Sequence, residues 1–303
     1  MNNQKHYTAA VAAFVIWGFF SIPLRALQAY PAGEILYFRI LFSAVVLLLI
    51  IFLFKKKDIR HDWSFFSSLS SKQKRMVVLL TLSGGALLTI NWLTFIHIVN
   101  AINIKTASFS YLICPVITAV LGYVLIKEKL TLMQWTAVGL CALSCVLIGM
   151  NSALELGYSF LTAFTYALYL ITQRKNQGFD RIVMLGLQML FSFLLLNFAY
   201  PYLVESVPVV PKFYGVILII AVVFTVLPLF LNLFALNKIK SATIGILMYI
   251  NPLLNFTLAF IMFNEEVNDL QIVGYGLIGV ALIIFNYPYF RKIQAAVSVR
   301  RAG

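Results

Sequence analysis

Residues 104–130 read IKTASFSYLICPVITAVLGYVLIKEKL, and residues 239–267 read IKSATIGILMYINPLLNFTLAFIMFNEEV. In each stretch a proline interrupts the apolar run, a glutamate follows thirteen residues later, and a glutamine opens the next run nineteen residues after the proline. The two series are Pro115, Glu128, Gln134 and Pro252, Glu265, Gln271. The match is not perfectly collinear, since Lys105 lies ten residues before its proline and Lys240 twelve. A repeat at this distance decides the fold; a chance likeness of hydrophobic helix pairs is the alternative.

The composition places the chain in lipid. It is 62% hydrophobic and 11% charged with a mean hydropathy of +0.93, whereas soluble domains are about 45–50% apolar and about 25% charged. Apolar runs of about twenty residues recur, and a run of that length spans the hydrocarbon core as a helix. Cys114, Cys141 and Cys145 lie inside such runs, where packing explains them better than a disulfide or a metal. We expect an all-α integral membrane protein without a cofactor.

Ten transmembrane helices are predicted. The first apolar run is read as a membrane helix rather than a signal peptide, because the next run begins almost at once. The long hydrophilic loop at residues 55–75 is the candidate for a surface amphipathic segment. The predicted spans are 7–27, 33–54, 76–98, 106–126, 130–150, 156–173, 182–202, 213–235, 241–263 and 268–290.

The loop charges predict the orientation, because basic loops stay cytoplasmic. With the N-terminus inside, 19 of the 23 Lys and Arg residues fall in inside segments, and the outside keeps Arg25, Arg39, Lys105 and Lys212. Both termini are then cytoplasmic and the protein is expected in the inner (plasma) membrane. This sign pattern explains the net charge of +13, so no nucleic-acid partner is indicated.

The repeat and the span count together predict an inverted architecture. Five spans per half is an odd number, so the second half enters the membrane upside down relative to the first. The loop flanks agree, because they read Lys127-Glu128-Lys129 in the first half and Asn264-Glu265-Glu266 in the second. We expect two inverted five-helix repeats over residues 1–150 and 151–303. Such repeats can expose one midplane site to either side of the membrane, which is the main argument for transport.

Several motifs resemble those of a known family. They are Ile16-Trp17-Gly18, Pro31–Leu36 with Arg39, Asn91-Trp92-Leu93, Ala107-Ser108 through Tyr111 to Pro115, Gln134-Trp135, Thr225–Leu229 and Tyr249–Pro252. Through them the sequence resembles, over essentially its whole length, the EamA family of the drug/metabolite transporter superfamily and, within it, the RarD type. It departs at Cys114, where asparagine is expected, and at Asn264, where glycine usually precedes the glutamate. The resemblance implies ten helices in two halves around a central cavity, and transport of amino acids, other metabolites or drugs.

The predicted hinge residues are Pro115, Pro228 and Pro252. A proline inside a helix removes a backbone hydrogen bond and bends the helix. At membrane depth the freed carbonyl must be satisfied by protein or by a water-lined cavity. Each position is either a packing kink or a hinge in a cavity wall, and the equivalent placement of Pro115 and Pro252 favours the hinge.

Neutral polar and aromatic residues inside the spans form the candidate cavity lining. Polar groups at this depth are costly unless they face the bundle interior. Each is either a hydrogen bond between helices or a contact with solute, and together they favour an aromatic or amphipathic small molecule. The candidate set is Asn91, Trp92, Tyr111, Tyr166, Thr225, Asn232, Tyr249, Asn251 and Asn255.

A charged group is predicted near the first outer loop. Arg25, Glu34 and Arg39 either form an interfacial ion pair or build an outer gate whose positive field attracts carboxylates. His97, near the outer end of the third span, is the candidate proton site, because histidine titrates near neutral pH. Its alternative role is an interfacial hydrogen bond.

The predicted function is secondary transport of small organic metabolites, as a permease or exporter with amino acids or aromatic compounds among the candidate solutes. No carboxylate falls in the middle third of a predicted span, so proton-coupled export of organic cations is disfavoured. An intramembrane enzyme would need a carboxylate pair, a metal-binding helix or a nucleophile with its base, and the chain lacks these motifs. A receptor or scaffold would rely on residues 55–75. The sequence carries no signal for an oligomeric state.

Overall fold

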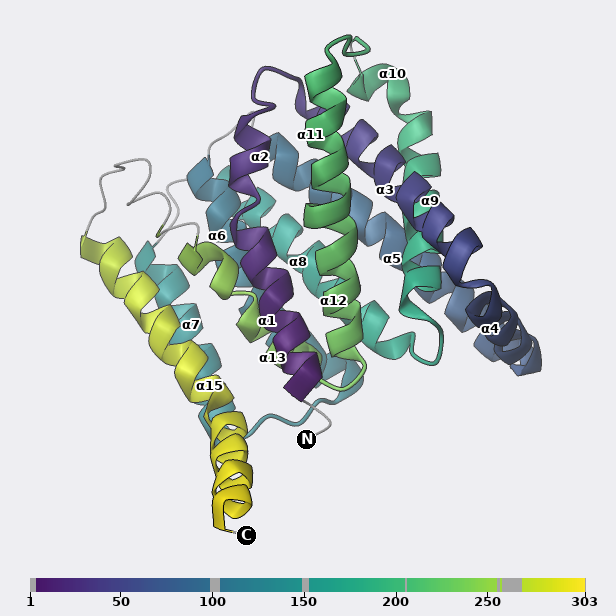
Figure 1. Cartoon of the computed structure of the whole chain (residues 1–303). Helices are drawn as coiled ribbons and strands as arrows, with labels where there is room; N and C mark the ends of the chain where they lie inside the picture. The colour runs from purple at the N-terminus through teal and green to yellow at the C-terminus, as the bar shows by residue number, and fades with distance from the viewer. Residues whose placement is uncertain are drawn as a thin grey trace.

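The computed structural model describes residues 4–98, 104–148, 153–204, 206–254, 257 and 269–302, which form helices and no strand (Figure 1). The helices are α1 Gln4–Gly18, α2 Ser21–Arg25, α3 Ala32–Phe54, α4 Lys56–Ser68, α5 Ser71–His97, α6 Ile104–Ile126, α7 Leu132–Ile148, α8 Ala153–Lys175, α9 Arg181–Phe198, α10 Tyr200–Leu203, α11 Pro211–Ala221, the π-helical turn η2 Val222–Val226, α12 Leu227–Leu236, α13 Ser241–Leu247 and α15 Asp269–Ala302.

Within the described ranges, seven helical segments are long and apolar enough to cross a membrane, and three shorter apolar helices accompany them. Each of the ten overlaps one predicted span, while the number of membrane crossings itself stays a prediction. The seven are Gln4–Leu24, Ala32–Phe54, Ser71–His97, Phe109–Ile126, Leu154–Lys175, Arg181–Phe198 and Pro211–Leu236, and the shorter three are Leu132–Ile148, Ser241–Leu254 and Ile272–Tyr287.

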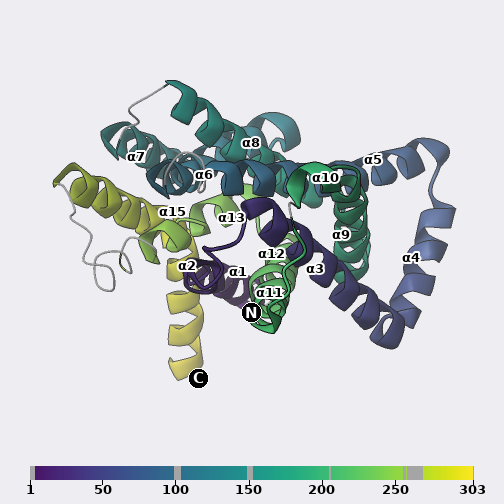
Figure 2. The ribbon, with the colours of Figure 1, turned by 90° about the horizontal axis from the view of Figure 1, so that it is seen from above.

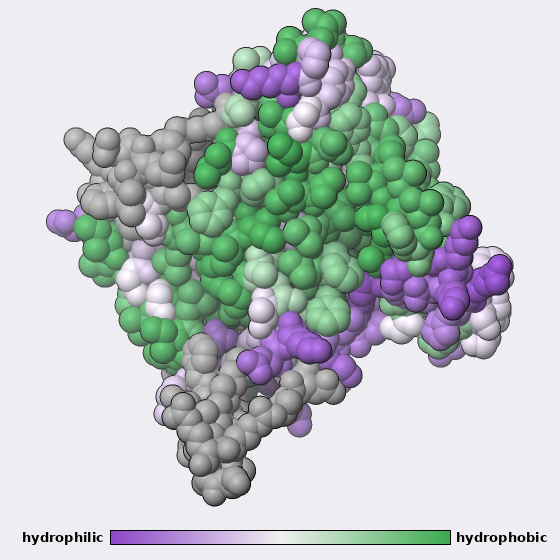
Figure 3. Space-filling view, in the orientation of Figure 1, coloured by the Kyte–Doolittle hydropathy of each residue, from purple (hydrophilic) through white to green (hydrophobic). Residues whose placement is uncertain are grey.

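The surface matches a protein that lies in lipid. Figure 3 shows a broad hydrophobic band across the visible face, with hydrophilic residues gathered above it, below it and over α4. Large apolar side chains on several helices point outward, among them Phe52, Leu79, Val146, Ile219 and Ile283. Exposed apolar surface of this extent indicates contact with a membrane rather than with water. The expectation of an all-helical membrane protein is confirmed.

The first predicted span is divided into α1 and α2. Pro23 has no N–H to donate to the carbonyl of Phe19, and that carbonyl instead accepts from the N–H of Ile22 at 3.1 Å. At the end of α1, a Cβ on Gly18 would lie 2.6 Å from Leu254 Cδ1, so the glycine permits close packing. A single smooth helix is thus interrupted where the chain turns toward α3.

The hydrophilic loop predicted as a surface segment forms α4, which docks on the connection between α8 and α9. Asp62 accepts hydrogen bonds from the backbone N–H of Asp180 at 3.0 and 3.2 Å. Lys55 Nζ lies 2.7 Å from Asp180 Oδ2. Asp180 also caps α9, because its Oδ1 accepts from the N–H groups of Ile182 and Val183. One aspartate therefore fixes the beginning of α9 and the position of α4.

The repeated glutamine of the first half begins a helix. Gln134 Oε1 accepts from the N–H of Thr131 at 3.0 Å, and Thr131 Oγ1 accepts from the N–H of Gln134 at 3.3 Å. This reciprocal pair is a capping box, which satisfies backbone donors at a helix N-terminus. The polar residue before the apolar run of α7 thus has a local structural reason.

The two sequence-equivalent prolines lie in different local structures. α6 is continuous through Pro115. The helix that begins at Ser241 ends at Leu247, passes through a turn at Met248 and Tyr249, and resumes before Pro252. Pro252 cannot donate to the carbonyl of Met248, and that carbonyl accepts instead from the N–H of Asn251 at 3.0 Å.

Helices of the two predicted halves pack in matching pairs. α3 packs on α9, α6 on α13 and α7 on α15, and each pair joins helices that hold equivalent places in the two predicted halves. α5 of the first half packs on α8 of the second. α1 of the first half packs on α12 of the second, and this is the pair that an exchange of the two halves would produce from α5 and α8. Figure 2 shows α7 with α15 at one end of the molecule and α4 at the other.

The basic connections lie together at one side of the bundle. Lys240 Nζ donates to the carbonyl of Lys129, and Arg174 donates to the carbonyl of Leu236. The connections that follow α6, α8 and α12 are therefore neighbours in space. α1 begins and α15 ends toward this side (Figure 1). The loops predicted as cytoplasmic thus share one side of the molecule.

Candidate functional site

Arg39 is the charged side chain at the centre of the candidate site. It is the eighth residue of α3 and is only 5% exposed. Its Nε donates to Thr225 Oγ1 at 2.7 Å. Its guanidinium carbon lies 4.5 Å from the ring centroid of Trp92 and 5.0 Å from that of Phe20. A buried positive charge therefore joins α3, α5 and η2, and the aromatic faces stabilise it by about 1–2 kcal/mol.

The π-helical turn η2 sets the position of Thr225. Thr225 Oγ1 donates to the carbonyl of Ile220, five residues earlier, at 2.9 Å. Pro228 cannot donate to the carbonyl of Phe224, and this carbonyl accepts from Trp17 Nε1 at 2.9 Å. π-helical turns of this kind occur frequently at functional sites, because they free backbone groups inside a helix. The predicted hinge Pro228 thus lies beside a backbone carbonyl that turns toward α1.

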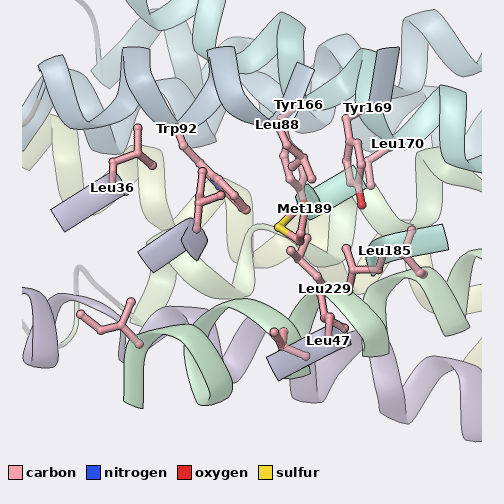
Figure 4. Packing of buried hydrophobic residues seen from close by; sticks show 14 of the residues in the cluster. Leu36, Leu47, Leu88, Trp92, Tyr166, Tyr169, Leu170, Leu185, Met189 and Leu229 are labelled. Atoms are coloured by element: carbon pink, nitrogen blue, oxygen red, sulfur yellow. The ribbon is translucent and has the colours of Figure 1, made fainter. Parts of the chain in front are cut away.

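A second polar contact joins α8 to α12. Asn232 Nδ2 donates to the hydroxyl of Tyr166 at 2.9 Å, and both side chains are buried. The ring of Trp17 lies 6.3 Å from that of Tyr166, and Tyr169 follows at 5.8 Å. Figure 4 shows Trp92, Tyr166 and Tyr169 pointing from their helices into the same interior layer. We call Arg39, Asn91, Trp92, Tyr166, Thr225 and Asn232 the central cluster.

Three buried polar atoms in this region have no hydrogen-bond partner among the described residues. They are Asn91 Oδ1, the hydroxyl of Tyr169 and Asn232 Oδ1. The side chain of Asn91 is held by its amide nitrogen, because Nδ2 donates to the carbonyl of Thr162 at 2.7 Å. Buried polar atoms are nearly always satisfied, and leaving them unpaired costs free energy. These are the groups with which water or a solute would form hydrogen bonds.

Tyr249, a predicted cavity residue, lies apart from the central cluster. It is fully buried in a second hydrophobic cluster formed by α6, α7, α13 and α15. Its hydroxyl donates to the carbonyl of Leu112 at 2.7 Å, and Cys145 Sγ donates to the same carbonyl at 3.4 Å. This carbonyl lies beside the one freed by Pro115. The geometry favours a bond between helices for Tyr249.

Of the remaining predicted cavity residues, Tyr111 lies within electrostatic range of Arg39 and Tyr166 in the central cluster. Tyr111 is half-buried against the main hydrophobic cluster, with its ring 5.1 Å from that of Phe95. Asn251 is half-buried in the segment before Pro252. Asn255 lies outside the described residues.

The predicted outer group is divided by the structure. Glu34 is 1% exposed, and its Oε1 accepts from the backbone N–H of Ser206 at 3.0 Å. Among the residues that the structure covers, Glu34 forms no ion pair with Arg39. Their separation of five positions corresponds to about 7.5 Å along the helix axis. The side chain of Arg25 lies outside the described part.

A cavity of about 470 Å³ lies between the beginning of α3 and the end of α5. His97 is exposed in its wall, with its ring 5.3 Å from that of Tyr158. No residue of the central cluster is among the described residues that line this cavity, although Leu36 precedes Arg39 by three residues and Leu93 follows Trp92 directly. The lining residues are Ala32, Gly33, Leu36, Leu93, Thr94, Ile96, His97, Tyr158 and Leu203.

Glu128 connects the two halves at the basic side. Its Oε1 accepts from the N–H of Ser241 at 2.9 Å and its Oε2 from the N–H of Ala242 at 3.1 Å. Arg174 Nε lies 3.7 Å from the same carboxylate. Glu128 as a whole residue is 9% exposed. A carboxylate at a helix N-terminus satisfies backbone donors and complements the helix dipole. The connection between α6 and α7 thus holds the beginning of α13.

The site residues expected from the sequence do not include Trp17, Phe20 or Glu128. Trp17 stood within a family motif, and Glu128 stood at a repeated position, so both carried a signal. Phe20 carried none, because the turn between α1 and α2 that brings it over Arg39 is not visible in the hydrophobic pattern.

A lipid-facing surface around a buried cation and unpaired polar atoms defines a multi-pass helical membrane protein with a polar site in its interior. The EamA-like transporter family matches residues 4–150 and again residues 154–287. The chain therefore belongs to the EamA-like transporter family, and it is a membrane transporter of the drug/metabolite type. This confirms the family expected from the sequence motifs.

Individual relatives agree with the family and cover nearly whole chains. "Uncharacterized transporter YojE" of Bacillus subtilis is 28% identical over 301 residues, which is 96% of each chain. An "uncharacterized transporter" of Vibrio cholerae is 30% identical over 99% of this chain and 96% of its own. "Protein RarD" of Escherichia coli is 27% identical over 91% and 92%. The resemblance to the RarD type is thus supported along the whole length.

The fold also recurs in a solved crystal structure. The two superpose with a TM-score of 0.73 over 94% of this chain and 98% of the other, at 13% sequence identity. At that identity the likeness concerns the fold alone.

Proposed function

We propose that the protein is a secondary transporter of small organic metabolites that works by alternating access. Two inverted five-helix repeats, residues 1–150 and 151–303, enclose the central cluster in the inner membrane with both termini in the cytoplasm. Amino acids and aromatic or amphipathic compounds are the proposed solutes, and His97 is the proposed proton site. Exchange of conformation between the halves would open the cluster to one side and then to the other.

The observation that carries this proposal is that both halves build one buried polar centre. Arg39 and Asn91 come from the first half, and Thr225, Tyr166 and Asn232 come from the second. The bond from Arg39 to Thr225 and the bond from Asn91 to the carbonyl of Thr162 both cross between the halves. A site shared in this way changes its geometry whenever the halves move relative to each other.

The pairing of helices supports the inverted arrangement. Exchanging the halves turns the pair α5–α8 into α1–α12 and leaves α3–α9, α6–α13 and α7–α15 unchanged, and all these pairs occur. The basic connections on a single side agree with a cytoplasmic face under the positive-inside rule.

The test is counterflow in proteoliposomes with a labelled panel of amino acids and aromatic metabolites, with and without a pH gradient. We expect saturable, trans-stimulated flux of at least one solute, reduced about tenfold or more by Trp92→Ala. Val146→Ala, on the lipid-facing surface, is the matched control and keeps full flux. His97→Ala is expected to remove any effect of the pH gradient.

The topology is tested independently with reporter tags on the two termini. Both tags are expected on the cytoplasmic side. Tags on opposite sides would overturn the inverted arrangement, and the absence of saturable flux for every solute would overturn the transport proposal.

A further inference from the structure

Arg39 differs from the other strongly buried arginine of the described structure in how its donors are used. Arg181 is equally 5% exposed, and its guanidinium donates to Asn237 Oδ1 and to the backbone carbonyls of Gln173 and Asn176. All three of its nitrogens therefore bond to protein. In Arg39 only Nε bonds to an acceptor within the described residues, namely Thr225 Oγ1.

The contacts of Arg39 stabilise the cation without neutralising it. No carboxylate in the described ranges lies within ion-pair distance of Arg39. Trp92 and Phe20 attract the guanidinium through their ring faces, and Thr225 offers a neutral hydroxyl. A buried cation without an anionic partner is unfavourable in a low-dielectric interior. The terminal nitrogens of Arg39 retain the geometry that binds a carboxylate in a bidentate manner.

The 470 Å³ cavity lies next to this region along α3 and α5. Leu36, in its wall, lies one helical turn before Arg39 on α3, and Leu93 adjoins Trp92 on α5. The lining is mainly apolar. A molecule with an apolar body and one anionic end would fit this arrangement, with its body against the apolar cavity wall and its anionic end at the guanidinium of Arg39.

We propose that Arg39 binds the carboxylate of the transported solute, so that the substrate class is the small organic carboxylate with an apolar or aromatic body. This rests on the proposed transport function and adds the substrate class to it. The carboxylate accepts hydrogen bonds from the terminal nitrogens along the edge of the guanidinium plane, while Nε keeps its bond to Thr225. The unpaired oxygens of Asn91 and Asn232 then accept from donors elsewhere on the solute.

The experiment measures binding of matched probe pairs to the purified full chain by ligand-induced shifts in thermal stability. The pairs are phenylacetate with phenylacetamide and L-phenylalanine with L-phenylalaninamide, which differ in the carboxylate. We expect each carboxylate to bind about tenfold more tightly than its amide, the effect of about one charge-assisted hydrogen bond. In Arg39→Gln this preference should disappear. Arg181→Gln, which removes an equally buried but fully bonded arginine, should keep it.

A second variant keeps the proposal falsifiable if Arg39→Gln does not fold. Arg39→Lys retains the charge and should still prefer the carboxylates, with weaker binding because the bidentate geometry is lost. Equal affinity of the wild type for carboxylates and amides would overturn the inference, as would an unchanged preference in a folded Arg39→Gln. Saturable flux of the amides with no carboxylate preference would overturn this substrate class alone and leave the transport proposal standing.

Discussion

Replacing Glu128 with glutamine should weaken the connection between α6 and α13 and favour a conformation open at the basic side. The carboxylate accepts from two backbone N–H groups, at 2.9 and 3.1 Å, and lies 3.7 Å from Arg174 Nε. The glutamine amide keeps one acceptor oxygen, so one charge-assisted bond and the negative charge at a helix N-terminus are lost.

The magnitude follows from those two terms. A hydrogen bond to a charged group contributes about 1.5–3 kcal/mol, and a charge at a helix terminus contributes about 0.3–1 kcal/mol. The expected change is about 2–4 kcal/mol. If the bonds form only when the basic side is closed, this shifts the equilibrium between closed and open forms by about 30- to 1,000-fold.

The assay is the labelling rate of a cysteine that is buried in the closed form. Ile239 is 3% exposed beside α13, so Ile239→Cys in a chain without its native cysteines should react slowly with a membrane-impermeant maleimide. Adding Glu128→Gln should raise that rate about tenfold or more when the reagent is applied to inside-out vesicles. Asp269→Asn, at an exposed carboxylate, is the control. An unchanged rate in a folded Glu128→Gln variant would refute the reasoning.

The other predictions concern the central cluster, the outer end of α3 and the docking of α4. Asn232→Leu removes a buried oxygen without a partner and also the bond from Nδ2 to the hydroxyl of Tyr166. Thermal denaturation should therefore show a loss of about 1–3 kcal/mol, while counterflow falls about tenfold; unchanged counterflow would contradict a solute-facing role. Gly33→Ala places a Cβ 2.0 Å from the carbonyl oxygen of Leu203. This overpacking should destabilise the protein by about 1–3 kcal/mol. A melting temperature equal to that of the wild type would contradict this prediction. Burial raises the pKa of Asp62 although the Asp180 N–H opposes the shift. The folded state therefore holds this proton more readily than the unfolded state, so the contribution of Asp62 should weaken as the pH rises through and above about 4. Asp62→Asn should remove that dependence in melting curves measured between pH 4 and 7.

The sequence predicted the helices well because each membrane span must satisfy its backbone internally. Apolar length alone therefore located all ten described apolar segments. The surface helix α4 was likewise visible as the one long hydrophilic stretch. Lateral arrangement was less accessible, because α3 is apolar on every side and gives no amphipathic signal for the face that meets its neighbours.

Arg39 illustrates this limit. Sequence spacing grouped it with Arg25 and Glu34 near the outer loop, since all three follow one another closely. In the structure Glu34 bonds to the backbone of Ser206, while Arg39 lies deeper and meets Thr225 from the other half. The contact depends on η2, and no residue preference in Val222–Val226 announces a π-helical turn. A contact between distant helices that depends on an irregular backbone cannot be predicted from the local pattern of residues.

The prolines show why repeats of similar sequence are informative even where their structures differ. Pro115 and Pro252 hold the same place in the two copies, yet α6 continues through the first, while the helix before the second turns at Met248 and Tyr249. At Pro252 the freed carbonyl of Met248 accepts from the N–H of Asn251, and near Pro115 the carbonyl of Leu112, next to the one that this proline frees, accepts from the hydroxyl of Tyr249. Two arrangements of one motif thus occur in the same molecule, and each places a hydrogen bond on a carbonyl near its proline. In the proposed alternating access, an exchange of these arrangements between the halves would need such bonds in both end states, because an unpaired backbone group inside a membrane is costly.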